Sequence, residues 1–122
     1  MRIFKNKFIT KFARKQGISD QELKETVARA ESGLVDADLG GGVIKQRIAR
    51  KGQGKSGGYR SIILFKCGDK AFFVYGFAKS ERENISHAEL MEFKTFAATY
   101  LNVSSIQLDR LVELGIFTEI TP

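Results

Sequence analysis

The sequence predicts an α+β fold in which helices cover one face of an antiparallel sheet. Two observations favour this class. Apolar residues recur with the helical period of about 3.6 near both ends of the chain, and they alternate with the strand period of two in its middle. The chain has 122 residues, of which 43% are hydrophobic. That is enough to bury a core without disulfides, so we expect one domain over residues 1–122.

The N-terminal third is predicted to form two helices. The first follows from aromatic residues that recur every fourth position, namely Phe4, Phe8 and Phe12. Its opposite side is basic, and Gly17 ends it. Ser19 and Glu22 have the spacing of a capping box, which predicts that the second helix starts there. Gly33 is expected to end that helix.

The middle and the C-terminal third are predicted to form a sheet followed by further helices. Residues 34–42 and 50–58 are rich in glycine and are expected to be loops. Gly68 and Asp69 form a tight-turn signal between the second and third strands. Strands are predicted over residues 43–49, 59–67 and 71–78, helices from Ser86 to Leu101 and over 104–114, and a short fourth strand over 116–120. The expected sheet therefore has three to four antiparallel strands, and the face without helices is available for function.

The charge of the chain indicates a polyanionic partner. The net charge is +6 and the isoelectric point is near 9.6. No acidic residue occurs before Asp20 or between Asp38 and Asp69, although both stretches contain several lysines and arginines. A solvated basic surface would also account for scattered cations. Two acid-free stretches of this length in a small chain favour nucleic acid as the partner.

Composition also excludes several classes of function. Cys67 is the only cysteine and His87 the only histidine, so we expect no disulfide, no metal site and no cofactor. No apolar run is long enough to cross a bilayer, and the first residues lack the apolar stretch of a signal peptide. We therefore expect a cytoplasmic protein with no membrane partner.

Alternation along the strands gathers cations and aromatic rings on one face. Phe73, Tyr75, Phe77 and Lys79 are expected to point the same way in the third strand. A face built from Arg47, Arg60, Tyr75 and Lys79, with Lys51 and Lys55 on the adjoining loop, suits RNA, because cations hold phosphates and rings stack on bases. The alternative is that the rings are core residues and the cations face water. Both readings stay open, since both faces of this strand are apolar.

The glycine-rich stretch over residues 51–60 resembles a phosphate loop only superficially. The nucleotide-binding pattern needs a glycine where Ala49 stands, and its Gly-Lys-Ser opens a helix, whereas this stretch leads into a strand. We therefore reject nucleotide binding. The glycines would still let the backbone approach a phosphate closely.

Three runs together resemble a known family. They are Leu-Gly-Gly-Gly-Val-Ile-Lys-Gln-Arg-Ile-Ala over residues 39–49, Gly-Gln-Gly-Lys-Ser-Gly-Gly-Tyr-Arg over 52–60, and Phe-Phe-Val-Tyr-Gly-Phe-Ala-Lys-Ser-Glu-Arg over 72–82. They are similar to RelE/HigB-type toxins of bacterial type II toxin–antitoxin systems. Within the RelE/ParE superfamily, they most resemble the subgroup with a Gly-Lys-Ser-Gly-Gly-aromatic-Arg motif. The resemblance extends from Phe4 to about Phe117.

The resemblance implies a RelE-like, microbial-ribonuclease-like fold and metal-independent cleavage of mRNA on the ribosome, which inhibits translation and arrests growth. It implies neutralisation by a cognate antitoxin, which by analogy has a helix-turn-helix DNA-binding domain. The catalytic residues it implies are Arg47, Lys55, Arg60 and Lys79, and the substrate-binding residues are Lys45, Lys51, Tyr75, Glu81 and Arg82. His87 is either a further catalytic residue or an exposed histidine in the first turn of a helix.

Cleavage without a metal would use the 2′-hydroxyl of the RNA as nucleophile, and it needs a base, an acid and positive charge on the phosphate. Arg47 and Arg60 are expected to hold the phosphate. Crowded cations favour the neutral form of a lysine, so Lys55 or Lys79 is the expected base. Two alternatives remain open: a ParE-like toxin that poisons gyrase, and an RNA-binding module without catalysis.

Overall fold

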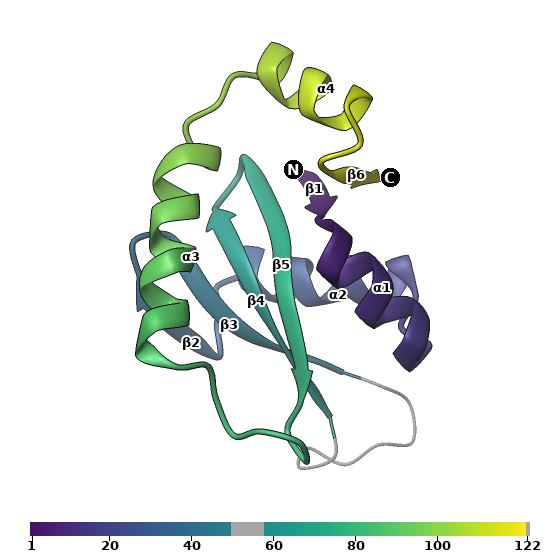
Figure 1. The fold of residues 1–122 in the computed structure, drawn as a ribbon, viewed down its shortest axis with the longest axis vertical. Coiled ribbons are helices and arrows are strands. Elements are labelled where there is room, and N and C mark those ends of the chain that lie inside the picture. Colours follow the sequence, from purple (N-terminus) through teal and green to yellow (C-terminus); the bar gives the residue numbers. More distant parts are fainter. Residues whose placement is uncertain (50–57, 122) are drawn as a thin grey trace.

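The computed structural model describes residues 1–49 and 58–121 and has an α+β fold built on a mixed sheet. The strands follow the order β2-β3-β4-β5-β1-β6 (Figure 1). In chain order the elements of this described part are β1 (Arg2–Lys5), α1 (Lys7–Gln16), α2 (Asp20–Glu31), β2 (Ala37–Gly40), β3 (Val43–Ile48), β4 (Tyr59–Lys66), β5 (Lys70–Ala78), α3 (His87–Tyr100), α4 (Ser105–Glu113) and β6 (Thr118–Ile120).

Most predicted elements are confirmed to within a few residues. The capping box of Ser19 and Glu22 starts α2, as expected. Equivalent boxes at Ser86 and Ser104 start α3 and α4. Each box satisfies two backbone donors that the first turn of a helix leaves without partners. The residues that do this are close in the sequence, so the starts of these helices can be predicted from it.

The prediction for the first residues was wrong. Phe4 lies in a strand, β1, and not in the first helix. Its buried ring stacks on that of Phe72, with 5.0 Å between the ring centroids. The strand β1 runs parallel to β5 and antiparallel to β6. The sheet is therefore mixed rather than purely antiparallel. The pairing of β1 with β5 joins segments far apart in the chain, so no turn sequence between them predicts it.

The loop predicted over residues 34–42 contains the edge strand β2, which forms a hairpin with β3. The glycines Gly40, Gly41 and Gly42 all have positive φ and make this turn. At Gly42 a Cβ atom would lie 2.5 Å from the side chain of Leu101, so this turn packs closely against α3. The glycine run therefore shapes a hairpin and a helix contact, which composition alone cannot distinguish from a loop.

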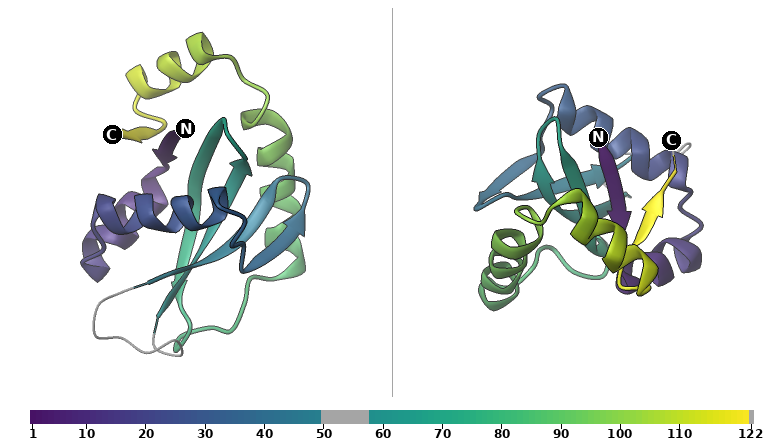
Figure 2. Two further views of the ribbon diagram at one scale, coloured as in Figure 1. Left: turned by 180° about the vertical axis from the view of Figure 1, so that it is seen from behind. Right: turned by 90° about the horizontal axis from the view of Figure 1, so that it is seen from above.

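Helices cover both faces of the sheet, so the prediction of one wholly free face was also wrong (Figure 2). On one face α1 and α2 bury Ile9, Leu23 and Val27 against the sheet. On the other face α3 buries Phe93 and Ala97. Along β3, exposure on the α3 face increases from the fully buried Val43 to residues 45 and 47, which are half-buried.

A bulge in β5 decides which aromatic residues share that face. The pairing register moves from Ile63 opposite Phe73 to Ile62 opposite Tyr75, so the bulge leaves Val74 as the extra residue of β5. Phe73 belongs to the core of α1 and α2, whereas Tyr75 packs with the α3 core. The expectation that Phe73 and Tyr75 point the same way was wrong for this reason.

Helix α1 lies against β5 beyond the point where β1 ends, and Gly76 permits this close approach. A Cβ atom at Gly76 would lie 2.8 Å from two ring carbons of Phe12.

We predict that Gly76→Ala lowers the free energy of unfolding by about 1–3 kcal/mol, because the ring and its helix must shift. Gly58→Ala is the control, since a Cβ atom there would meet its nearest neighbour at an ordinary 3.6 Å. Urea denaturation measures both, and equal stabilities of the two variants would contradict this packing.

Candidate functional site

Two candidate arginines lie side by side on the α3 face of the sheet. Arg47 of β3 is paired with Arg60 of β4, and Arg60 is paired in turn with Phe77 of β5. Lys45, Ile62 and Tyr75 form the neighbouring row. Residues directly opposite one another in antiparallel strands share a face. The structure therefore brings Lys45, Arg47, Arg60 and Tyr75 together, as alternation predicted, with Phe77 beside them.

The two arginines repel one another and are only half-buried. Burial lowers the pKa of Arg60 from its ordinary value, and the neighbouring charge of Arg47 lowers it further. Asp36 opposes this shift; its carboxylate accepts a hydrogen bond from the backbone N–H of Arg47 at 2.7 Å and lies 3.8 Å from the Arg47 Nε. Because one carboxylate faces two adjacent arginines, their positive charge is only partly neutralised, and this favours the binding of an anion.

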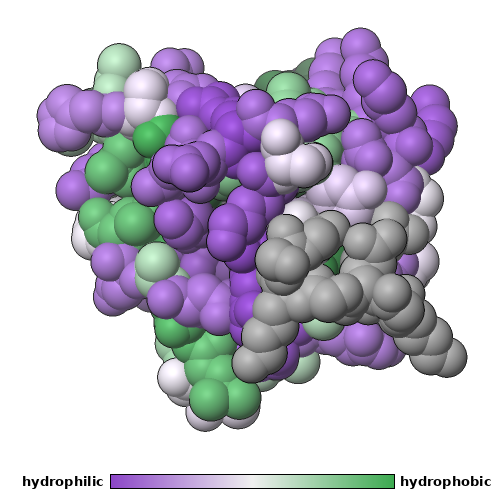
Figure 3. Space-filling model, turned by 90° about the horizontal axis from the view of Figure 1, so that it is seen from below, coloured by the Kyte–Doolittle hydropathy of each residue, from purple (hydrophilic) through white to green (hydrophobic). Residues whose placement is uncertain are grey.

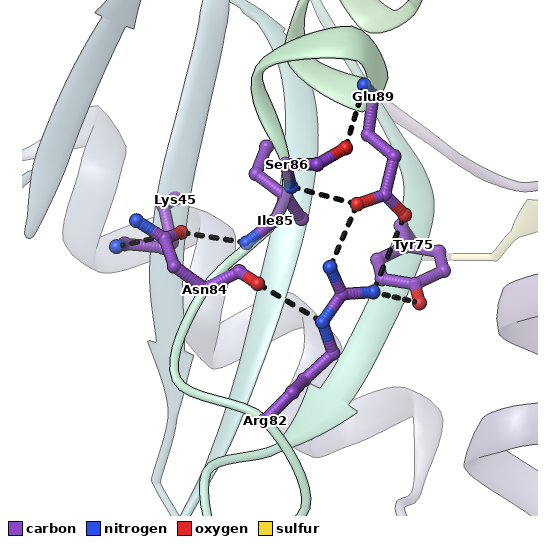
Figure 4. Close-up of polar contacts among 7 residues, drawn as sticks. All are labelled: Lys45, Tyr75, Arg82, Asn84, Ile85, Ser86 and Glu89. Atoms are coloured by element: carbon purple, nitrogen blue, oxygen red, sulfur yellow. Dashed lines mark hydrogen bonds and ion pairs between the residues drawn. The ribbon is translucent and has the colours of Figure 1, made fainter.

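Arg82 is fixed beside this row by a network of contacts (Figure 4). Its guanidinium donates to Glu89 at 2.7 Å, to the Tyr75 hydroxyl at 2.8 Å and to the backbone oxygen of Asn84 at 2.9 Å. It also lies over the rings of Tyr75 and Phe77, 5.7 Å from each centroid. The loop between β5 and α3 thus supplies a cation that packing and hydrogen bonds hold in one orientation.

Glu89 has two functions in this network. Its carboxylate accepts the hydrogen bonds of Arg82 and also that of the Ser86 backbone N–H at 2.7 Å, which completes the capping box of α3. The bonds from Arg82, followed by that from Ser86, lower the pKa of Glu89 to about 2. The same pairing raises the pKa of Arg82. The start of α3 and the position of Arg82 are therefore coupled.

The remaining sequence-predicted residues are less closely associated. The Lys45 ammonium donates to the Asn84 side chain at 3.2 Å. Lys79 is exposed just beyond the end of β5, and Glu81 is exposed in the turn that follows. His87 is the first residue of α3 and is exposed. Lys51 and Lys55 lie outside the described residues.

A groove between α1 and β5 adds residues that the sequence analysis did not assign to a site. Its volume is about 410 Å³. Its floor includes Tyr75 and Phe77, and α1 contributes Phe8, Lys11, Phe12 and Lys15 to its wall. The aromatic spacing of α1 suggested a core stripe, and nothing in the sequence indicated that Phe8 would be 45% exposed. Figure 3 views the molecule from below, and hydrophilic residues cover much of this side.

Two further chemistries find no support in the described residues. No three histidine, cysteine, aspartate or glutamate side chains of residues 1–49 and 58–121 are grouped so as to hold a metal ion. No helix in this part of the chain is long and apolar enough to cross a bilayer. Cations beside exposed aromatic rings are instead a common arrangement in surfaces that bind single-stranded nucleic acid.

Comparison with known proteins identifies the family. The fold and the arginines paired across β3 and β4 define a small α+β protein with a cationic sheet face. A sequence profile described as the RelE toxin of the RelE/RelB toxin–antitoxin system matches residues 1–120. The chain therefore belongs to the RelE toxin family, and it is a toxin of a toxin–antitoxin system. None of the curated proteins compared with the chain matches it.

The Glu89 contacts predict a defined pH dependence of stability. The pKa of Glu89 is about 2 in the folded protein, below its ordinary value of 4.5, so its stabilising contribution is complete above pH 4.5 and is lost as the pH falls toward 2. Glu89→Gln should therefore be less stable than the wild type at pH 6, and the difference should shrink steadily at lower pH. Glu92→Gln, on an exposed position of the same helix, is the control. Urea denaturation at several pH values measures both, and a difference for Glu89→Gln that does not vary with pH would contradict the network.

Proposed function

We propose that this toxin is an mRNA endoribonuclease of the RelE/HigB kind, which cuts messages on the ribosome and is neutralised by a cognate antitoxin. The strongest support is that Arg47 and Arg60 lie side by side on the sheet face that α3 covers only in part. Phe77 and Arg82 are their neighbours. Membership of the RelE family supports the toxin role. The resemblance to the HigB subgroup rests largely on residues 54–60, most of which lie outside the described residues.

The proposed reaction needs no metal. The 2′-oxygen of one nucleotide attacks the adjacent phosphorus, the bond from phosphorus to the 5′-oxygen breaks, and a 2′,3′-cyclic phosphate and a 5′-hydroxyl result. A base takes the 2′-hydroxyl proton, and an acid protonates the leaving 5′-oxygen. Negative charge grows on the phosphoryl oxygens, and Arg47 and Arg60 stabilise it at the point where it develops.

We assign the other candidates as follows. Lys79, which directly follows the last residue of β5, or Lys55 is proposed as the base. Lys45, Lys51, Tyr75, Glu81 and Arg82 are proposed to position the RNA. The ribosome supplies the messenger RNA and orients it. We propose that residues 1–122 form one toxin domain that carries this sheet face.

Arg60 is the most informative residue to change. Arg60→Ala should reduce RNA cleavage roughly a hundredfold or more, because a planar guanidinium that holds the phosphate in two hydrogen bonds is lost. Arg60→Lys should restore only part of the activity, since an ammonium cannot reproduce that geometry. The measurement is growth after induced expression, together with the mapping of transcript ends.

The control for this experiment is Arg110→Ala, which removes the same charge from an exposed position on α4. Both variants should melt close to the wild type, because the side chain of Arg60 has no ion-pair partner among the described residues and Arg47 repels it. An Arg60→Ala protein that melts normally and still arrests growth would remove Arg60 from the site. DNA damage in place of transcript breaks would indicate gyrase poisoning, and the absence of both would indicate an RNA-binding module.

The proposed antitoxin is acidic in the segment that contacts the toxin. A net charge of +6 gives the toxin a field that attracts such a chain and accelerates its association. We predict that purification from the native operon yields a complex with a protein encoded next to the toxin, one that by analogy carries a helix-turn-helix domain. Its co-expression should restore growth. Recovery of the toxin alone, with growth still arrested, would contradict this partner.

A further inference from the structure

We propose that the groove between α1 and β5 binds one unstacked base of the RNA, with Phe8 as the stacking surface and Lys11 and Lys15 on the flanking phosphates. This inference rests on the proposed ribonuclease function and extends its substrate site beyond the sheet face. The groove has a volume of about 410 Å³, within the range of 300–1,000 Å³ typical of ligand sites.

Phe8 lies beside the core contact of α1 and not within it. Helix α1 packs on the sheet through Ile9 and Ala13, which are both buried. Phe8 lies next to this buried contact. Its ring stacks on that of Tyr75, with 4.6 Å between the centroids and an angle of 23° between the ring planes. The Phe8 ring also stacks at longer range on Phe12, with centroids 6.4 Å apart, yet 45% of Phe8 is exposed, so the ring still offers surface to a base. Bases bind to such surfaces whatever their identity.

The surroundings of the Phe8 ring are mainly basic. Lys11 and Lys15 line the same groove one helical turn apart, and Arg82 lies on its other side. Among the described residues that line it, Glu81 is the only acidic one. Neither lysine makes an ion pair with any residue that the structure describes. Positive charges spaced along a ring-lined groove match a base flanked by phosphates.

The groove is continuous with the proposed cleavage site. Phe77 lies in the floor of the groove and is the cross-strand partner of Arg60. A strand of RNA whose phosphate contacts Arg60 therefore has a neighbouring nucleotide within reach of the groove. The exposed ring of Phe8 favours RNA here over an acidic segment of the antitoxin, which would need the cations but not the stack.

The chain has no tryptophan, so Phe8→Trp gives a fluorophore that reports this groove alone. A 2′-O-methyl hexanucleotide, which lacks the attacking hydroxyl, should quench that fluorescence by stacking. A backbone of the same length without bases should bind with little quenching. The matched control is Phe96→Trp, which places the fluorophore at a 37% exposed position on α3. Absence of quenching at Phe8→Trp when anisotropy of a labelled hexanucleotide shows saturation, or equal quenching at both positions, would overturn the proposal.

Cleavage of ribosome-bound mRNA distinguishes failure of the proposed ribonuclease function from failure of base binding in the groove. Phe8→Leu should lose about tenfold in cleavage rate at limiting message, and Phe8→Tyr should retain activity because it keeps the ring. Lys11→Ala with Lys15→Ala should weaken the salt dependence of cleavage, whereas Lys24→Ala on α2 should not. A wild type that does not cleave would refute the proposed function. A wild type that cleaves while all groove variants cleave equally would refute only the groove, as would variants that lose neutralisation by the antitoxin but keep full cleavage.

Discussion

The junction at Asn6 is the interaction on which the arrangement of this molecule depends. Its backbone N–H donates to the Phe73 oxygen at 3.1 Å, its side-chain amide donates to the Val74 oxygen at 2.9 Å, and its side-chain oxygen caps α1 by accepting from Ile9 at 2.9 Å. One residue therefore ends the parallel strand through its backbone, and its side chain caps the helix and donates to β5 at the bulge. The first turn of α1 is thereby tied to the two residues of β5 at which the pairing register shifts.

The bulge and the helix together create a surface with two parts. Beyond the bulge, Tyr75 and Phe77 turn toward the α3 face, where Arg47 and Arg60 lie on the neighbouring strands. On the other side of these rings, α1 adds its own ring and lysines. The core of α3 covers only part of this face, so the cations remain half-exposed. Their mutual repulsion costs stability in the isolated protein and would be relieved by a bound phosphate.

The sequence predicted those features that depend on local signals. Capping residues such as Ser19, turns such as Gly68-Asp69 and the alternation that places Arg47 beside Arg60 all act over a few positions. The parallel pairing of β1, the bulge at Val74 and the coverage by α3 depend on contacts between distant segments, and no local pattern reports them. The groove was missed for the same reason: Phe8 has the spacing of a core residue, and only the packing of α1 against β5 leaves it exposed.

In the proposed reaction, the cations of the sheet face promote attack by the RNA's own 2′-hydroxyl. The most direct measurement uses ribosomes programmed with a message that carries a single 2′-deoxynucleotide on the 5′ side of the main cleavage position. The account predicts that cleavage at that bond disappears, while cleavage at unmodified positions continues and leaves 2′,3′-cyclic phosphate and 5′-hydroxyl ends without any need for divalent metal. Undiminished cleavage at the substituted bond would contradict it.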